Sequence, residues 1–114
     1  MIRGEIWWAD FGLPFGSEPG FKRPVLIIQD NAFNRSKIHT VLVVPLTTNI
    51  ELAKAPGNVY AAKEKTKLPK DSVIVVSQLM ALDKKRLIKK RANPDNSLLS
   101  ETERGLLLVL GLKY

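Results

Sequence analysis

The sequence predicts a mainly β domain: a small, strongly bent antiparallel sheet of about five to seven strands with one C-terminal α-helix. Short runs of β-branched and aromatic residues recur along the chain, and turns containing glycine and proline separate them. The end of the chain instead carries a helix-start signal followed by a leucine-rich run. The 114 residues contain no repeat and no linker, so residues 1–114 are predicted to form a single domain.

The predicted strands are recognised by their apolar and β-branched character. RGEIWWADF is rich in aromatic residues, and its alternation places Trp7 and Trp8 on opposite faces. RPVLIIQ carries Pro24 near its start, where a strand tolerates proline. HTVLVVPLT is apolar almost throughout, which is typical of a central strand. In chain order the strands are residues 3–11, 23–29, 39–47, 58–62 and 71–82, the last being one long strand or a bent pair. The connections are loops at 12–20 and 48–57, a polar segment at 30–37, and cationic segments at 63–70 and 83–93.

The predicted helix lies at the end of the chain. Ser100 and Glu103 have the spacing of a capping box, and Glu101 and Glu103 suit the positive end of a helix dipole. The following residues, 106–112, are apolar almost without a break. Such a helix needs cover on nearly every side. We therefore expect it to pack on the sheet and against a second subunit, in a homodimer.

Composition excludes several classes of protein. The chain has no cysteine, so disulfides and thiolate chemistry are absent, and one histidine, His39, rules out a site that needs two. We find no membrane-spanning run and no signal peptide, and we expect a cytoplasmic protein without a metal or other cofactor. The net charge of +7 equals the excess in residues 63–91, which hold ten Lys or Arg and three acids. Such a segment indicates RNA, DNA or an acidic peptide as partner, although a solvated basic face has the same composition.

Three polar groups at the ends of predicted strands are candidate site residues. Arg23 follows Glu18 and Lys22 where a glycine-containing loop meets a strand, and its planar fork of donors suits a phosphate. Thr47 and Thr48 end the central strand, where hydroxyls donate to an anion or cap a turn. Ser77 and Gln78 end a later apolar run, where Gln78 either reads base edges or satisfies backbone groups. Each has an ordinary structural explanation when taken alone.

These segments together resemble the MazF/PemK family of toxin endoribonucleases from bacterial toxin–antitoxin pairs. The resemblance runs from RGEIWWADF through GSEPGFKRPVLIIQDNAFNR, VPLTT, DSVIVVSQ and LDKKRL to LLLVLGL. It implies a small SH3-like barrel with a C-terminal helix, related to the gyrase-poisoning toxin CcdB, and a homodimer. It also implies that Arg23 and Thr47 are catalytic and that Glu18 lies in the loop flanking the site. Lys22, Thr48 and Gln78 are then expected to bind substrate.

The activity that the resemblance implies is metal-independent, sequence-selective cleavage of single-stranded RNA, with mRNA the expected target. The RNA 2′-hydroxyl would attack the neighbouring phosphorus, leaving a 2′,3′-cyclic phosphate and a 5′-hydroxyl. The expected protein partner is a cognate antitoxin whose acidic segment competes for the basic groove. Ser77 and Met80 stand where family members often carry an acidic and a basic residue. Two alternatives therefore stay open, a non-catalytic gyrase-binding protein of the same fold and an inactive RNA-binding homologue.

Overall fold

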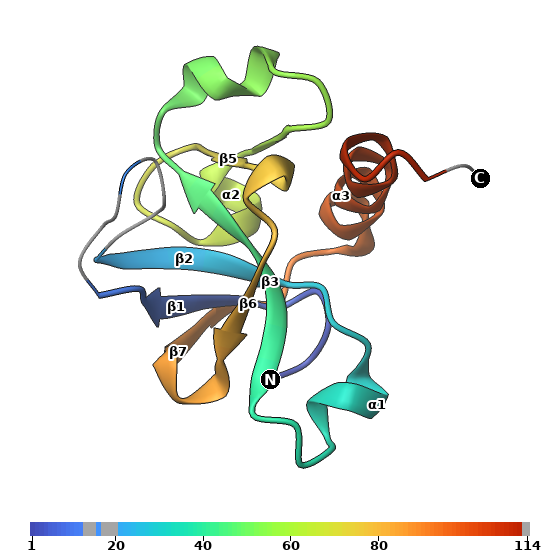
Figure 1. The fold of residues 1–114 in the computed structure, drawn as a ribbon. Helices are drawn as coiled ribbons and strands as arrows, with labels where there is room; N and C mark the ends of the chain where they lie inside the picture. Colours follow the sequence, from blue (N-terminus) through green and yellow to red (C-terminus); the bar gives the residue numbers. More distant parts are fainter. Residues whose placement is uncertain (13–15, 17–20, 113–114) are drawn as a thin grey trace.

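A seven-stranded antiparallel sheet forms the body of the molecule in the computed structural model, which describes residues 1–12, 16 and 21–112 (Figure 1). The strands are β1 (Ile6–Asp10), β2 (Lys22–Ile27), β3 (Thr40–Thr47), β4 (Val59–Ala61), β5 (Ser72–Ile74), β6 (Met80–Asp83) and β7 (Leu87–Ala92). The α-helices are α1 (Asn31–Asn34), α2 (Lys63–Thr66) and α3 (Asn96–Val109). Three 3-10 turns are η1 (Ile50–Lys54), η2 (Val76–Gln78) and η3 (Lys84–Arg86). The predicted fold class, mainly β with a C-terminal helix, is confirmed.

Strand β3 produces the bend in the sheet because it changes partners along its length. The strand order is β4-β5-β3-β2-β1-β7, and β6 also pairs with β3. The first part of β3 lies between β2 and β6, with Val43 opposite both Ile27 and Met80. Its last residues, Leu46 and Thr47, pair with β5 on the edge that β6 occupies earlier, while the ladder with β2 ends at Val25–Pro45. Strands β2 and β3 therefore separate near the end of β3, where β3 remains paired only with β5.

The core is divided between the two faces of this sheet. One cluster contains Ile6 and Leu26 and extends to α3, while the other contains Ala9 and Val25. Trp8 packs against the first cluster and Trp7 against the second. The alternation predicted for the tandem tryptophans is confirmed, and both rings are partly buried.

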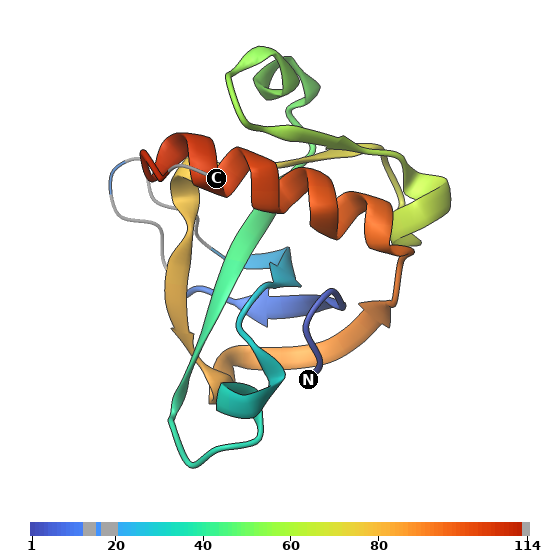
Figure 2. The ribbon, with the colours of Figure 1, turned by 90° about the vertical axis from the view of Figure 1, so that its right-hand side faces the viewer.

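Helix α3 crosses one face of the sheet (Figure 2) and approaches its neighbours through glycine. A Cβ built on Gly105 would lie 2.0 Å from the carbonyl oxygen of Gly57, so the two backbones touch. The helix begins earlier than the predicted capping box, because Asp95 is the N-cap and accepts a hydrogen bond from the Ser97 N–H. Ser100 lies within the helix, so the prediction of a start there was wrong.

Four predicted connections contain regular structure, and the predicted loop at 48–57 contains η1. In the polar segment, Asp30 caps the short helix α1 by accepting from the Ala32 N–H. The cationic segment 63–70 contains α2, and residues 83–93 contain η3 and the strand β7, which pairs with β1. The segment 71–82 is the bent pair, β5 and β6, separated by η2. In the part of the chain that the structure describes, no helix is long and apolar enough to cross a membrane.

Candidate active site

A cavity of about 440 Å³ opens where the ladder between β2 and β3 ends. Its walls come from four strands and from the segment that leads into β5. The lining residues are Trp8, Phe21, Lys22, Arg23, Pro24, Leu46, Thr47, Thr48, Leu68, Pro69, Lys70 and Ser72. A pocket of this size, with an apolar floor and a few polar groups, is typical of a ligand site.

The strand register brings Arg23 and Thr47 to this cavity although 24 positions separate them in the sequence. The β2–β3 ladder pairs Val25 with Pro45 and Ile27 with Val43. The ladder ends at the Val25–Pro45 pair, and Arg23 and Thr47 each lie two residues beyond this same end of it. Both residues line the cavity and both are partly buried. Arg23 and Thr47 therefore border one cavity, and their shared action on a phosphate stays a prediction.

The electrostatic character of the cavity comes from three cations. Lys22 and Arg23 reach it from β2, and Lys70 reaches it from the segment before β5. Among the described residues that line it, none is acidic. Three cationic side chains at one cavity favour an anionic ligand such as a phosphodiester.

The Thr47 hydroxyl has a structural role as well as a place in the cavity. Its Oγ1 accepts a hydrogen bond of 3.2 Å from the Asn49 N–H, so the hydroxyl caps the turn after β3. A hydroxyl that accepts one bond still has its own proton to donate. Thr47 is thus oriented by the backbone and able to donate to an anion. Thr48, which is exposed, lines the cavity beside it.

A hydrogen-bonded brace holds the wall that carries Lys70. The Tyr60 hydroxyl donates to Asp71 Oδ2 (2.5 Å), and the Lys63 N–H donates to Oδ1 (2.9 Å). Both bonds favour the ionised carboxylate, so the pKa of Asp71 lies below its ordinary value, and its bond raises the pKa of Tyr60. The Ser72 hydroxyl also donates to the Lys70 carbonyl oxygen (3.2 Å).

Other predicted site residues lie elsewhere or outside the described residues. Glu18 lies outside them. Gln78 is half-buried at the end of η2 and is absent from the cavity lining, so its role in binding substrate stays a prediction. Ser77 is exposed, and Met80 packs against the second core cluster.

Part of the cationic segment 63–91 serves the fold. Lys90 pairs with the buried Glu5 (2.9 Å), and Arg86 donates to the Asp10 carbonyl oxygen (3.0 Å). Lys84 donates to two carbonyl oxygens of the α1 turn, those of Asn34 and Ser36. The net charge of this segment is therefore not all available to a ligand. Within residues 1–12, 16 and 21–112, no three His, Cys, Asp or Glu side chains gather as a metal site would require.

Sequence reasoning did not identify Trp8, Phe21 or Lys70 as residues of one site. Trp8 is recognisable in the sequence only as a strand tryptophan, and Lys70 only as one of many cations. Their shared position depends on which strands pair and where the sheet separates. No local pattern in the sequence carries that information.

Comparison with known proteins places this geometry in a family. Residues 2–110 match the model of the PemK-like, MazF-like toxin of type II toxin–antitoxin systems. The chain is 44% identical over 112 residues to endoribonuclease MazF6 of Mycobacterium tuberculosis and to endoribonuclease MazF2 of Mycobacterium bovis, covering 98% of each chain.

Solved structures show the same fold. MazF from Deinococcus radiodurans superposes with a TM-score of 0.81 at 24% identity, covering 98% of this chain and 97% of that one. An endoribonuclease from mycobacterial species, in complex with its cognate antitoxin, gives 0.80 at 24% identity, covering 100% and 98%. The family model and the curated relatives extend over almost the whole sequence. The chain therefore belongs to the PemK-like, MazF-like family of type II toxin–antitoxin toxins.

Proposed function

We propose that the chain is a metal-independent, sequence-selective endoribonuclease that cleaves single-stranded RNA, with mRNA the expected target, as the toxin of a toxin–antitoxin pair. One observation supports the site in particular: Arg23 and Thr47 line the same cationic cavity. The activity itself follows from relatives at 44% identity that are endoribonucleases over the same length.

The proposed reaction uses a nucleophile that the substrate brings. The 2′-hydroxyl oxygen bonds to the adjacent phosphorus as the bond from phosphorus to the 5′-oxygen breaks. The products are a 2′,3′-cyclic phosphate and a 5′-hydroxyl. The 2′-hydroxyl loses a proton, and the leaving 5′-oxygen gains one. Negative charge grows on the non-bridging oxygens meanwhile. Arg23 donates to one of them, and Thr47 holds another in line.

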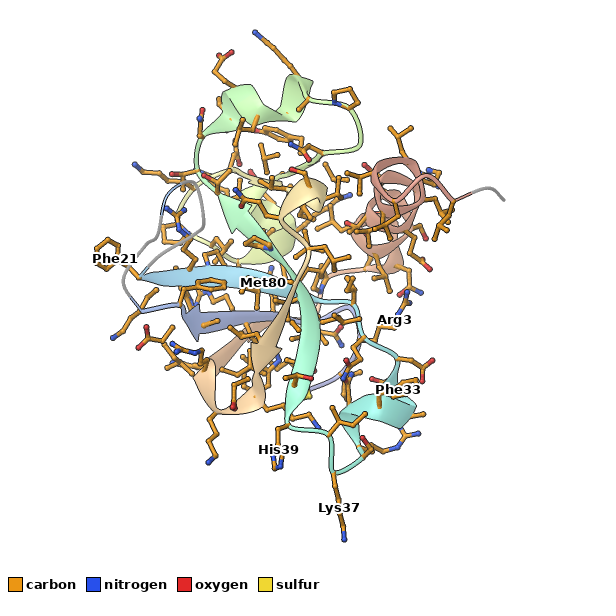
Figure 3. All side chains as sticks on the ribbon, in the orientation of Figure 1. Arg3, Phe21, Phe33, Lys37, His39 and Met80 are labelled. Atoms are coloured by element: carbon orange, nitrogen blue, oxygen red, sulfur yellow. The ribbon has the colours of Figure 1, made fainter. Side chains whose placement is uncertain are left out.

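His39 is not available to act as the base in this cavity. It precedes β3, whereas Thr47 ends that strand. Eight residues of extended chain at about 3.3 Å each separate the two by roughly 26 Å. Figure 3 shows His39 at the lower end of the molecule, apart from Phe21, which lines the cavity at its left side. Catalysis here therefore rests on positioning and on charge stabilisation.

The partners we propose are RNA, a second copy of the chain and an acidic antitoxin. Four apolar residues at the end of α3 and just after it are exposed, and a second subunit would bury this surface: Leu108, Val109, Leu110 and Leu112. An antitoxin segment rich in carboxylates suits the cationic cavity and would compete with RNA there. We also propose that the protein works in the cytoplasm, where mRNA is found.

The alternative of a gyrase-binding protein of the same fold is less well supported. A protein that only binds another protein has no need of a guanidinium and a hydroxyl beside two lysines in one cavity. An inactive RNA-binding homologue would keep the cations, so activity has to be measured directly.

The test is cleavage of single-stranded RNA in excess EDTA by the purified chain. We expect cleavage with cyclic-phosphate ends, and no cleavage of the same oligonucleotide made with 2′-deoxy or 2′-O-methyl residues. Inhibition of gyrase supercoiling without RNA cleavage would instead establish the alternative. Cleavage that stops when EDTA is added would contradict the metal-independent mechanism.

A further inference from the structure

Phe21, the residue before β2, combines an unfavourable backbone with an exposed ring. Its φ is +60°, in the left-handed region, and 61% of the residue is exposed. A residue other than glycine is uncommon in this region, and a bulky one costs more than glycine would. The ring therefore gains little from burial to offset the strain of its backbone.

Two backbone hydrogen bonds hold Phe21 in this conformation. Its N–H donates to the Gly12 carbonyl oxygen (2.5 Å), and its carbonyl oxygen accepts from the Phe11 N–H (2.8 Å). The chain before β2 is thus fixed to the chain after β1. Glycine would satisfy the same bonds with less strain, so the fold gives no reason for a phenyl ring at this position.

The position of the ring suggests a reason. Phe21 lines the cavity that contains Arg23 and Thr47, and it also lines a neighbouring cavity of about 520 Å³ with Asp10, Gly12 and Lys22. Figure 3 shows the ring pointing outward from the start of β2. It therefore stands between two hollows at the edge of the cationic site.

We infer that Phe21 is a stacking platform for a nucleobase next to the scissile phosphate. The inference rests on the proposed function and adds a base-binding subsite to it. A single strand held in the cationic cavity by its phosphate would place an adjacent base within reach of Phe21. Exposed aromatic rings beside cationic grooves are how proteins hold unpaired bases, and stacking tolerates any base. An apolar side chain of a protein partner is the competing occupant.

Binding to RNA that cannot be cleaved tests this inference separately from catalysis. The probe is a pool of short, random-sequence 2′-O-methyl RNA, and the proteins are the wild type, Phe21→Leu and Phe21→Tyr. Leucine keeps apolar bulk and the strained backbone but removes the aromatic face. Phe33→Leu is the matched control, because Phe33 is also exposed (53%) and lies on α1, well away from Phe21 (Figure 3).

We expect Phe21→Leu to raise the Kd by about 5- to 150-fold, the range for loss of one base–aromatic stack. Phe21→Tyr and Phe33→Leu should bind like the wild type. A probe carrying 2-aminopurine should lose fluorescence on binding the wild type and keep it with Phe21→Leu. Thermal unfolding of each variant checks that the fold is intact.

Two results would overturn the inference. One is that Phe21→Leu binds the 2′-O-methyl RNA with the same Kd as the wild type, even if this variant binds an acidic peptide more weakly. The other is an equal loss of affinity in Phe33→Leu. If the wild type binds through Phe21 but does not cleave natural RNA, the proposed function fails and the subsite stands. If it cleaves RNA and Phe21→Leu binds normally, only the subsite fails.

Discussion

Gly105→Ala tests how closely α3 is seated on the rest of the fold. In an isolated helix this change is stabilising by about 1 kcal/mol, because alanine has the higher helix propensity. In the protein, the added Cβ would lie 2.0 Å from the Gly57 carbonyl oxygen and 3.1 Å from Val76 Cγ1. An ordinary contact begins near 3.4 Å, so backbone atoms would have to separate by 1.4 Å. Helix propensity thus predicts that Gly105→Ala raises the free energy of unfolding, and packing predicts that it lowers it.

The expected net effect is destabilisation. Overpacking in a close-packed site costs roughly 3 kcal/mol at the upper end of its usual range, and the gain in propensity offsets about 1 of it. We therefore expect the free energy of unfolding to fall by about 2 kcal/mol and Tm to fall by about 8 °C. Urea unfolding followed by circular dichroism measures the first quantity, and a thermal scan measures the second.

Ser100→Ala is the matched control, because Ser100 is exposed on the same helix. It should stabilise the protein by a few tenths of a kcal/mol through propensity alone. If Gly105→Ala also raises the free energy of unfolding, the backbones of α3 at Gly105 and of the chain at Gly57 are not in close contact. Equal Tm values for Gly105→Ala and the wild type would refute the reasoning in the same way.

Two further predictions concern the buried carboxylate and the cationic wall. Burial raises the pKa of Glu5, but hydrogen bonds from Trp7, Lys90 and the Ile2 N–H outweigh it, so the pKa is lowered overall. Because the pKa of Glu5 is lower in the folded protein than in the unfolded chain, its ionised carboxylate stabilises the fold above the ordinary glutamate range. This stabilisation is lost as the pH falls through the folded-state pKa. Glu5→Gln should therefore lower the free energy of unfolding by about 1–3 kcal/mol at pH 7 and by progressively less in acid. Urea titrations of the variant and the wild type from pH 7 to pH 3 measure this difference, and a difference that stays constant would contradict the prediction. Lys70→Gln should weaken RNA binding and lower the slope of log Kd against log salt by about 0.7. Lys37, which is exposed at the lower end of the molecule in Figure 3, does not line the cavity, and Lys37→Gln should change neither quantity.

The strands that the sequence predicted well are those whose composition and environment agree. The valine, leucine and isoleucine residues of β2 and β3 are mostly buried, so strand propensity and burial both favour a strand. β7 was missed because it is an edge strand with cationic side chains, and its strand conformation comes from pairing with β1. The start of α3 was misplaced because Ser100 and Glu103 have capping-box spacing inside a helix that Asp95 already caps.

The candidate site was predictable only in part. Arg23 and Thr47 came from the family resemblance, and the end of the β2–β3 ladder explains how both reach the cavity. Lys70 and Phe21 carry no local signal, because one is a lysine in a cationic segment and the other a phenylalanine in a loop. Their place beside the cavity depends on the separation of β3 from β2 and on the Tyr60–Asp71 brace. These are long-range features of the sheet.

The central claim is that Arg23 and Thr47 act on one phosphate, and a double-mutant cycle on kcat tests it most directly. We expect Arg23→Ala and Thr47→Val each to lower kcat by about 10²–10³ with the fold intact. The double variant should lose much less than the product of the two, because groups that stabilise one charge are coupled. Singles that cleave at the wild-type rate, or a double variant whose loss equals the product, would contradict the shared site.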